Sequence, residues 1–319
     1  MNRRFALIQV LVSVIALGAV AWWASNQDAP ELPSTAGAYW WLAGGLGLYG
    51  LVTLLRGERW HRILHLTGVH SQRADAYALT TVGYMGNNVL PARAGEMLRV
   101  VLLAPRTDAN RRTLLGTIVA ERLLDAVALG SIFAVVVFGV LRETTVPSDR
   151  PLVVAGAGLA LLAAGLAVVQ VMRRRGMLAR ARDWLRPLAG APRALLSREG
   201  MVLLASSYLI WAMEASVYLA VARATDLDIS GMGALYLVAL TNLFAMLPAA
   251  PGYVGTFDAA VIFGVKATGG TESVALSYLL LLRFILFVPI TLVGLVVLVT
   301  RYGGWARLRA AVRLEASSA

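Results

Sequence analysis

"GYMGNNVLPARAGEMLR", residues 83–99, places one Pro, three Gly and three charged side chains inside an apolar stretch that runs from about residue 76 to residue 104. A simple membrane-spanning helix does not accommodate this composition. Each ionisable side chain at the centre of a bilayer costs about 2.5–3.5 kcal/mol by insertion scales. The stretch therefore predicts a broken helical element in which Arg93, Glu96 and Arg99 are held by partners of opposite charge or by water.

The whole chain has the composition of a membrane protein. It has 319 residues, of which 58% are hydrophobic and 15% are charged, with no Cys and a net charge of +11. Soluble domains carry about 25% charged residues, and several apolar segments here reach the length of about 20 residues that crosses a bilayer. We expect an all-α polytopic membrane protein. The positive charge then reflects arginines beside anionic lipid rather than nucleic acid, and the lack of Cys excludes disulfides and Cys-ligated metals.

Six full spans are predicted within a single transmembrane domain, residues 1–319: 5–24, 38–55, 113–141, 151–172, 200–222 and 275–299. The first of them is longer than the apolar region of a signal peptide and lacks a cleavage site, so we expect it to be a span. Residues 173–199 contain eight Arg and two Pro. This segment is expected to be a basic cytoplasmic loop that divides the chain into two halves.

Two further apolar stretches, 76–104 and 232–264, are broken near their middles. If both enter and leave the membrane on the same side, as re-entrant hairpins, nearly all arginines lie in the cytoplasm. The exterior loops then keep only Arg142, Arg150, Arg223 and Lys266, which satisfies the positive-inside rule. This topology predicts a bacterial-type inner-membrane protein with both termini in the cytoplasm and two hairpins that open to opposite sides.

The two broken stretches also resemble each other. "LPARAG" (90–95) and "LPAAPG" (247–252) match at Leu, Pro, Ala and Gly, and an acid follows each, Glu96 or Asp258. Weak internal similarity with reversed orientation is typical of inverted repeats, whose broken helices form a substrate site near the midplane. We expect repeats at 38–141 and 200–299. The expected hairpin hinges are Pro91, Gly95, Pro248, Pro251, Gly252 and Gly255.

Nine ionisable residues fall inside apolar segments: Arg93, Glu96, Arg99, Glu121, Arg122, Asp125, Glu214, Asp258 and Arg283. The first six carry no net charge, so one interpretation is a structural ion-pair network that locks the first hairpin in place. The alternative is that one of the three arginines holds a lipid phosphate, since the planar guanidinium binds phosphate through two hydrogen bonds. The three carboxylates of the six would then support it. Both interpretations stay open.

The second hairpin carries no arginine and is expected to act as a kinked packing element or as an exterior gate. Glu214 and Arg283 are expected to pair with each other, and the alternative is that Glu214 couples transport to protons. His61 and His65 lack a third ligand, which favours a solvated interfacial helix over a metal site. No catalytic motif is present, so we assign no catalytic residue, metal or cofactor.

Three stretches carry a resemblance to a known family: "NNVLPARAGEMLRVVLL" (87–103), "VAERLLDAVAL" (119–129) and "LPAAPGYVGTFDAAV" (247–261). The chain resembles the lysylphosphatidylglycerol synthase transmembrane, flippase-like family over nearly its whole length. The resemblance implies that a set of residues occupies family motif positions: Gly95, Glu96, Arg99, Glu121, Arg122, Asp125, Pro248, Gly252 and Gly255. No soluble aminoacyl-transferase domain is expected after the last span, so synthesis of lysyl-lipid is not implied.

The sequence thus predicts a lipid flippase or translocator that moves an anionic phospholipid or a polyprenyl-phosphate-linked lipid between leaflets. Arg93, Arg99 and Arg122 are the candidate ligands of the lipid phosphate. One alternative is an accessory subunit that presents a lipid carrier to a membrane glycosyltransferase or similar enzyme without transporting it. Another is a membrane-embedded transferase that uses the intramembrane carboxylates as bases.

Overall fold

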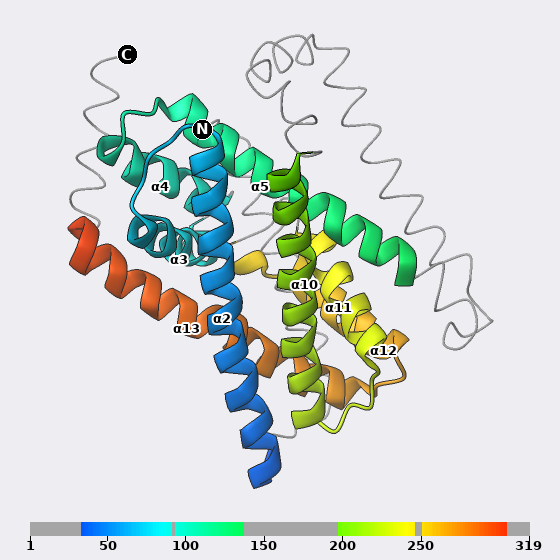
Figure 1. The fold of residues 1–319 in the computed structure, drawn as a ribbon. Helices are drawn as coiled ribbons and strands as arrows, with labels where there is room; N and C mark the ends of the chain where they lie inside the picture. Colours follow the sequence, from blue (N-terminus) through cyan, green and yellow to red (C-terminus); the bar gives the residue numbers. More distant parts are fainter. Residues whose placement is uncertain (1–32, 91–92, 137–196, 246–250, 305–319) are drawn as a thin grey trace, which may run out of the picture.

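A computed structural model describes residues 33–90, 93–136, 197–245 and 251–304, and in this part of the chain all regular structure is helical (Figure 1). The fold class is therefore all-α, as the sequence predicted. The α-helices are α2 (Ala36–Leu66), α3 (Arg73–Val89), α4 (Ala94–Leu103), α5 (Arg111–Ala134), α10 (Arg198–Ala224), α11 (Gly231–Ala245), α12 (Thr256–Ala267) and α13 (Glu272–Tyr302). The short 3-10 helices are η2 (Ala104–Arg106) and η5 (Pro251–Tyr253).

Three of the described helices, α2, α10 and α13, are long and apolar enough to cross a membrane. They coincide with the expected spans that begin at residues 38, 200 and 275. Helix α5 covers most of the expected span 113–141 but is not among the three, because Glu121, Arg122 and Asp125 interrupt its apolar sequence. Of the other expected elements, 5–24, 151–172 and nearly all of 173–199 lie outside the described residues.

Helices α2 and α10 form an antiparallel pair. Gly45 of α2 packs against Ala220 near one end of the pair, and Arg59 meets Ser207 near the other. Helix α2 is longer than the sequence predicted, since it continues from residue 55 to Leu66. The prediction that Arg56 and Arg59 belong to a cytoplasmic loop is wrong, because this extension places both side chains in the interior, 4% and 1% exposed.

The predicted broken stretches are two antiparallel helical hairpins. In the first hairpin, formed by α3 and α4, Gly83 and Gly86 face α4 so closely that the backbone at Gly95 touches α3. In the second, formed by α11 and α12, Gly264 packs against Leu237 and Leu240. The first hairpin follows the Leu66 end of α2 and the second follows the Ala224 end of α10, so the hairpins begin at opposite ends of the α2/α10 pair (Figure 1).

The described residues that flank the two hairpin turns meet between these two ends. We call them the hairpin tips: residues 88–90 and 93 in the first hairpin, and residues 245 and 251–253 in the second. Arg93 Nη2 donates a hydrogen bond to the carbonyl oxygen of Ala245 at 2.6 Å. On the other side of the tip, the α-carbon of Gly252 faces the carbonyl of Asn88, because a Cβ added to Gly252 would lie 3.4 Å from that oxygen. The two hairpins, which are far apart in the sequence, therefore touch through their connecting turns.

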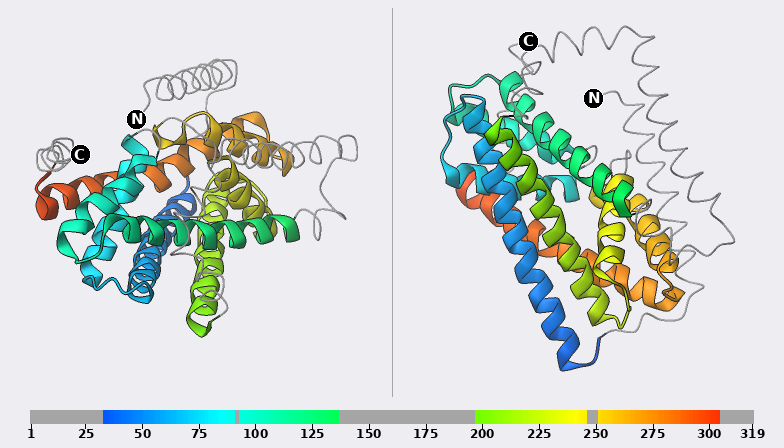
Figure 2. Two further views of the ribbon diagram at one scale, coloured as in Figure 1. Left: turned by 90° about the horizontal axis from the view of Figure 1, so that it is seen from above. Right: turned by 45° about the vertical axis from the view of Figure 1, so that its right-hand side comes forward.

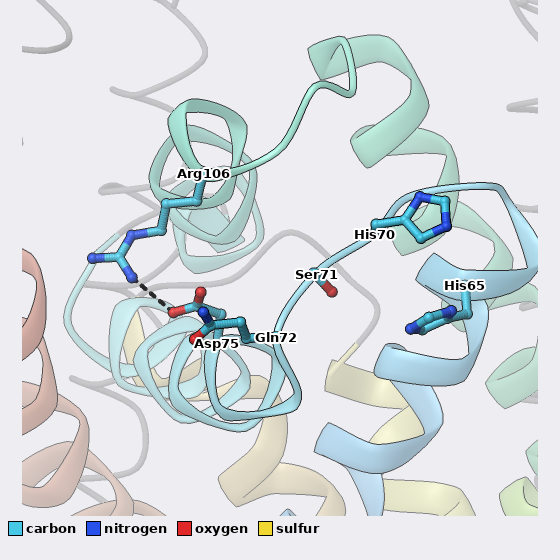
Figure 3. A pocket seen from close by; sticks show the side chains of 6 residues that line it. All are labelled: His65, His70, Ser71, Gln72, Asp75 and Arg106. Atoms are coloured by element: carbon cyan, nitrogen blue, oxygen red, sulfur yellow. Dashed lines mark hydrogen bonds and ion pairs between the residues drawn. The ribbon is translucent and has the colours of Figure 1, made fainter.

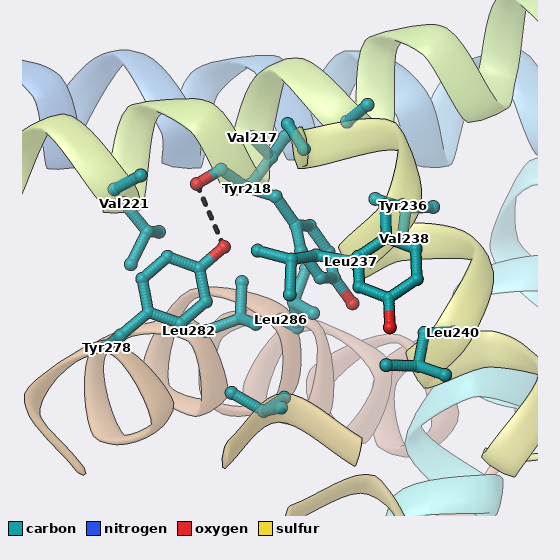
Figure 4. Packing of buried hydrophobic residues seen from close by; sticks show 14 of the residues in the cluster. Val217, Tyr218, Val221, Tyr236, Leu237, Val238, Leu240, Tyr278, Leu282 and Leu286 are labelled. Carbon is teal, nitrogen blue, oxygen red and sulfur yellow. Dashed lines mark hydrogen bonds between the residues drawn. The ribbon is translucent and has the colours of Figure 1, made fainter. Parts of the chain in front are cut away.

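The remaining helices bind this arrangement together. Helix α13 runs antiparallel along α3, where Asn88 Nδ2 donates to Thr291 Oγ1 at 2.9 Å, and it also packs on α10, where Tyr278 donates to the carbonyl of Tyr218 at 3.0 Å (Figure 4). Helix α5 crosses the α2/α10 pair (Figure 2). It also contacts α4 and α11. Helix α5 therefore touches one helix of each hairpin.

We expect Gly95→Ala to destabilise the protein, because the added Cβ would lie 1.9 Å from the carbonyl oxygen of Gly83 and 2.6 Å from the backbone nitrogen of Asn87. Overpacking of this kind costs about 1–3 kcal/mol or more, and the contacting atoms are backbone atoms that cannot move aside. Gly47→Ala is the control, since its Cβ would meet open space within α2. Thermal unfolding of the detergent-solubilised variants, followed by circular dichroism, compares them. Equal midpoints would contradict the close packing.

Candidate functional site

The two carboxylates of α5 face inward. Glu121 and Asp125 are four residues apart and so share one face of the helix; both are buried. That face meets α2 and α4, which each supply an arginine. Arginines of α2 and α4, together with Arg122 of α5 itself, are the charge partners of the two carboxylates. This pairing offsets the cost of burying the carboxylates in an apolar setting.

Arg59 of α2 lies at the centre of this arrangement. Its Nη1 donates to Asp125 Oδ1 and to Ser207 Oγ, both at 2.7 Å, and its Nη2 lies 3.4 Å from Glu121 Oε1. Arg59 was not predicted as a site residue, because the run of charges at Arg56, Glu58 and Arg59 is typical of the end of a membrane span. The spacing of Trp60, Ile63 and Leu64, however, indicates that a helix with a buried apolar face continues beyond these charges.

Arg99 of α4 is also committed to the interior. Its Nη2 donates to Glu121 Oε2 at 2.7 Å, and its guanidinium carbon lies 4.0 Å from the centre of the Trp60 ring. The residue is 2% exposed. Among the three predicted phosphate ligands, Arg99 is therefore the most deeply buried, and it is held by Glu121.

Arg122 joins the two sides of the site. Its Nε lies 3.2 Å from Glu96 Oε1, and its terminal nitrogens lie 3.4 Å from Asp125 Oδ2 and 3.6 Å from Glu121 Oε1. Its side chain is nevertheless 31% exposed. Arg122 is thus shared among three carboxylates and still has surface that a further anion can reach.

Arg93 has the weakest carboxylate partner of the four arginines. Glu96 Oε1 lies 4.0 Å away and is its one carboxylate contact within that distance among the described residues, and the side chain is 30% exposed. Its guanidinium lies over the Tyr253 ring, 5.3 Å from the ring centre. The backbone of Arg93 is left-handed, with φ 54°, and its side chain does not cap α4. The N-terminus of α4, a position that attracts anions, is therefore next to an arginine with little counter-charge.

These seven residues form the charge cluster: Arg59, Arg93, Arg99, Arg122, Glu96, Glu121 and Asp125. The six residues identified from the sequence carry no net charge. Arg59 adds a fourth guanidinium to three carboxylates, so the cluster carries one uncompensated positive charge. Arg59 joins the cluster because α2 continues beyond residue 55, where the sequence predicted the span to end.

The expected pair between Glu214 and Arg283 is also wrong. Glu214 pairs with Arg56, whose guanidinium lies between the rings of Tyr84 and Trp211. Arg283 pairs instead with Asp258. The physical reason is the antiparallel α2/α10 packing, which sets Glu214 directly beside Arg56, whereas α13 approaches α12 rather than this part of α10.

The Asp258–Arg283 pair repeats a feature of the charge cluster. Glu96 and Asp258 are each the third residue of the second helix of a hairpin. Each carboxylate meets the Nε of an arginine on the next long helix, Arg122 or Arg283. Asp258 Oδ2 also accepts from the backbone N–H of Gly255 at 2.8 Å, which caps α12. The two halves of the chain therefore place equivalent ion pairs behind the two hairpin tips.

The expected hinges lie at or beside the tips. Gly252 and Gly255 have positive φ angles of 66° and 89°, a backbone conformation that glycine adopts without steric cost. Pro251 begins η5, and Gly95 forms the α3–α4 contact. Pro91 and Pro248 lie outside the described residues.

The described residues contain no group of three or more His, Asp or Glu side chains placed to hold a metal ion. Each carboxylate of the charge cluster lies within 4.0 Å of at least one guanidinium. The arrangement is suited to binding an anion at Arg93 and Arg122, the two partly exposed arginines.

Comparison with known proteins agrees with this membrane setting. The chain is 22% identical over 283 residues to Glycosyltransferase AglD of Haloferax volcanii, an alignment that covers 74% of this chain and 45% of that protein. The chain thus spans less than half the length of this curated relative. No solved structure matches the chain.

The model of one protein family matches nine-tenths of the chain, from residue 7 to residue 294, and thereby covers every described helix except the last turns of α13. Together with three helices able to cross a membrane, this match establishes a multi-pass membrane protein. The chain belongs to the family described as the lysylphosphatidylglycerol synthase TM region.

Proposed function

We propose that the protein moves an anionic phospholipid or a polyprenyl-phosphate-linked lipid between the two leaflets of the membrane. The observation that carries this proposal is the uncompensated positive charge of the charge cluster, which falls to Arg93 where the two hairpin tips meet. A phosphodiester carries one negative charge, so a lipid phosphate bound there would neutralise the cluster while the acyl chains remain in the bilayer.

The surroundings of Arg93 supply the other groups that a phosphate needs. Arg122 is partly exposed on the far side of Glu96, and the uncapped N-terminus of α4 offers backbone N–H groups. Glu96 lies within 4.0 Å of both arginines and orients them. In this proposal Arg93 and Arg122 bind the phosphate, whereas Arg59 and Arg99 hold Glu121 and Asp125 in place.

The two hairpins provide a route to both sides of the membrane. We interpret them as re-entrant hairpins of an inverted repeat, one open to the cytoplasm and one to the exterior, in a bacterial-type inner membrane. The hydrogen bond from Arg93 to the carbonyl of Ala245 joins their tips. A phosphate that replaces this carbonyl as the partner of Arg93 would separate the tips, so binding of the lipid itself would open the path past the second hairpin.

Arg283 would act on the exterior side. Its Nη1 donates to the carbonyl of Gly252 at 3.2 Å, so it holds the same turn that Arg93 approaches through Tyr253. Arg283 has one carboxylate partner, Asp258, where Arg122 has three. We assign the Asp258–Arg283 pair to gating of the second hairpin.

A second candidate function is a non-transporting subunit that presents a lipid carrier to a membrane glycosyltransferase. The similarity to Glycosyltransferase AglD, confined to 45% of that protein, favours it, since this region would then accompany a separate transferase. On this view the charge cluster still binds a lipid phosphate. Neither function makes the protein itself an enzyme.

Arg93→Asn tests the phosphate ligand without straining the chain, because Asn tolerates the left-handed backbone of residue 93. Loss of a charged hydrogen bond costs about 1.5–3 kcal/mol, so we expect transport of fluorescent phosphatidylglycerol across proteoliposome membranes to fall about tenfold or more. Arg62→Asn, which alters an exposed pair with Glu58, is the control and should transport normally. Unchanged transport by Arg93→Asn would remove Arg93 from the mechanism. If the wild type transports no candidate lipid but co-purifies with a glycosyltransferase, the second function holds.

Separation of the hairpin tips can be tested by cross-linking introduced cysteines. Because the chain has no native Cys, the reagent reacts with no other thiol of the protein. We expect a short bifunctional thiol reagent to join Asn88→Cys to Gly252→Cys, since these backbones are in contact, and to stop lipid transport. Each single-cysteine variant treated with the same reagent is the control and should keep its transport rate. Full transport by the cross-linked double variant would show that the tips need not separate.

A further inference from the structure

A polar pocket lies at the arginine-rich end of α2, where the first hairpin begins (Figure 3). Its volume is about 510 Å³, within the range of small-molecule sites. The last turn of α2, the connection to α3, the first turn of α3 and η2 together supply its lining: His65, His70, Ser71, Gln72, Asp75 and Arg106. None of these residues belongs to the charge cluster.

The single carboxylate in the lining, that of Asp75, already accepts hydrogen bonds from three side chains. Asp75 Oδ1 accepts hydrogen bonds from Arg106 at 2.8 Å, from Arg301 at 3.0 Å and from Tyr302 at 2.9 Å. Two guanidinium groups therefore face one carboxylate, which leaves an excess of one positive charge at this wall of the pocket. A cation would be repelled, whereas an anion would find a charge partner in Arg106, whose side chain is 37% exposed.

The residues just before Asp75 present donors. Ser71 Oγ is buried and makes no hydrogen bond within the described structure. The side chain of Gln72, at the N-cap position, does not cap α3, so N–H groups of its first turn also lack a side-chain acceptor. A buried hydroxyl without a partner costs free energy, and an acceptor in the pocket would satisfy both the hydroxyl and the start of the helix.

Two imidazoles complete the lining. The rings of His65 and His70 lie edge to face with centres 5.8 Å apart, and those of His61 and His65 lie edge to face at 4.6 Å. Each neutral imidazole offers one N–H donor and each protonated one offers two. The expectation of a solvated helix here is wrong for His61, which is 7% exposed, whereas His65 is exposed.

We propose that this pocket binds a phosphate group, through Arg106, Ser71 Oγ–H, the imidazoles and the N-terminus of α3. The phosphate belongs either to a lipid headgroup of the adjacent leaflet or to a soluble phosphate compound; both offer the same oxygen acceptors and negative charge. The site is separate from the transport site, and its occupation does not depend on the proposed function.

Isothermal titration of the detergent-solubilised full chain with inorganic phosphate and with glycerol 3-phosphate tests the soluble source. Native mass spectrometry with added phosphatidylglycerol tests the lipid source. We expect at least one soluble probe to bind the wild type and Arg93→Asn equally, or one phosphatidylglycerol molecule to stay bound to Arg93→Asn. Ser71→Ala and His70→Ala should each weaken that binding about tenfold, since each removes a donor to a charged group. Arg62→Gln, on the exposed surface of α2, should bind as the wild type does.

Binding of a soluble probe alone assigns a soluble ligand, and binding of the lipid alone assigns a headgroup. The proposal is overturned if none of the three probes binds, or if binding survives both Ser71→Ala and His70→Ala unchanged. Loss of all binding in Arg93→Asn with retention in Ser71→Ala and His70→Ala would also overturn it, because the phosphate would then lie at the charge cluster alone. Thermal unfolding midpoints of the variants show whether each one is folded.

Discussion

The buried guanidinium of Arg59 is the constraint on which the rest of the structure depends. A charged side chain that is 1% exposed requires partners of opposite charge, because an unpaired charge in an apolar interior costs several kcal/mol. Asp125 and Glu121 from α5 and Ser207 from α10 supply those partners. Arg59 therefore fixes how α2, α5 and α10 meet. Glu121 in turn binds Arg99, which ties the first hairpin to the same centre.

Close backbone contact gives the first hairpin its rigidity. At Gly95 the two helices approach so nearly that even a methyl group would overlap the carbonyl of Gly83. The second hairpin has looser contacts, with Gly264 against leucine side chains, and its tip contains three residues of positive φ, Gly252, Tyr253 and Gly255. In the proposed mechanism the first hairpin holds the charge and the second hairpin moves.

The two halves use one local design for different purposes. Each places a carboxylate in the first turn of a hairpin's second helix and pairs it with an arginine of the following long helix. In the first half two more carboxylates and three more arginines surround this pair, whereas in the second half Leu282 and Leu286 stand where α5 has Glu121 and Asp125 around Arg122. The charged residues are thus concentrated on one side of the tip contact.

The sequence by itself determined the membrane class, the two broken elements and six of the seven residues of the charge cluster, because hydropathy and intramembrane charges are local properties of the chain. It also indicated Glu96 and Asp258 as equivalent acids. Only the tertiary structure decided which charges pair. Arg59 and Arg56 enter the interior because α2 continues past its apolar segment, and Glu214 meets Arg56 rather than Arg283 because α2 and α10 are antiparallel. Which charges pair depends on the register of helices that are far apart in the sequence. The charge cluster has a net charge of +1 only because this register brings Arg59 into it.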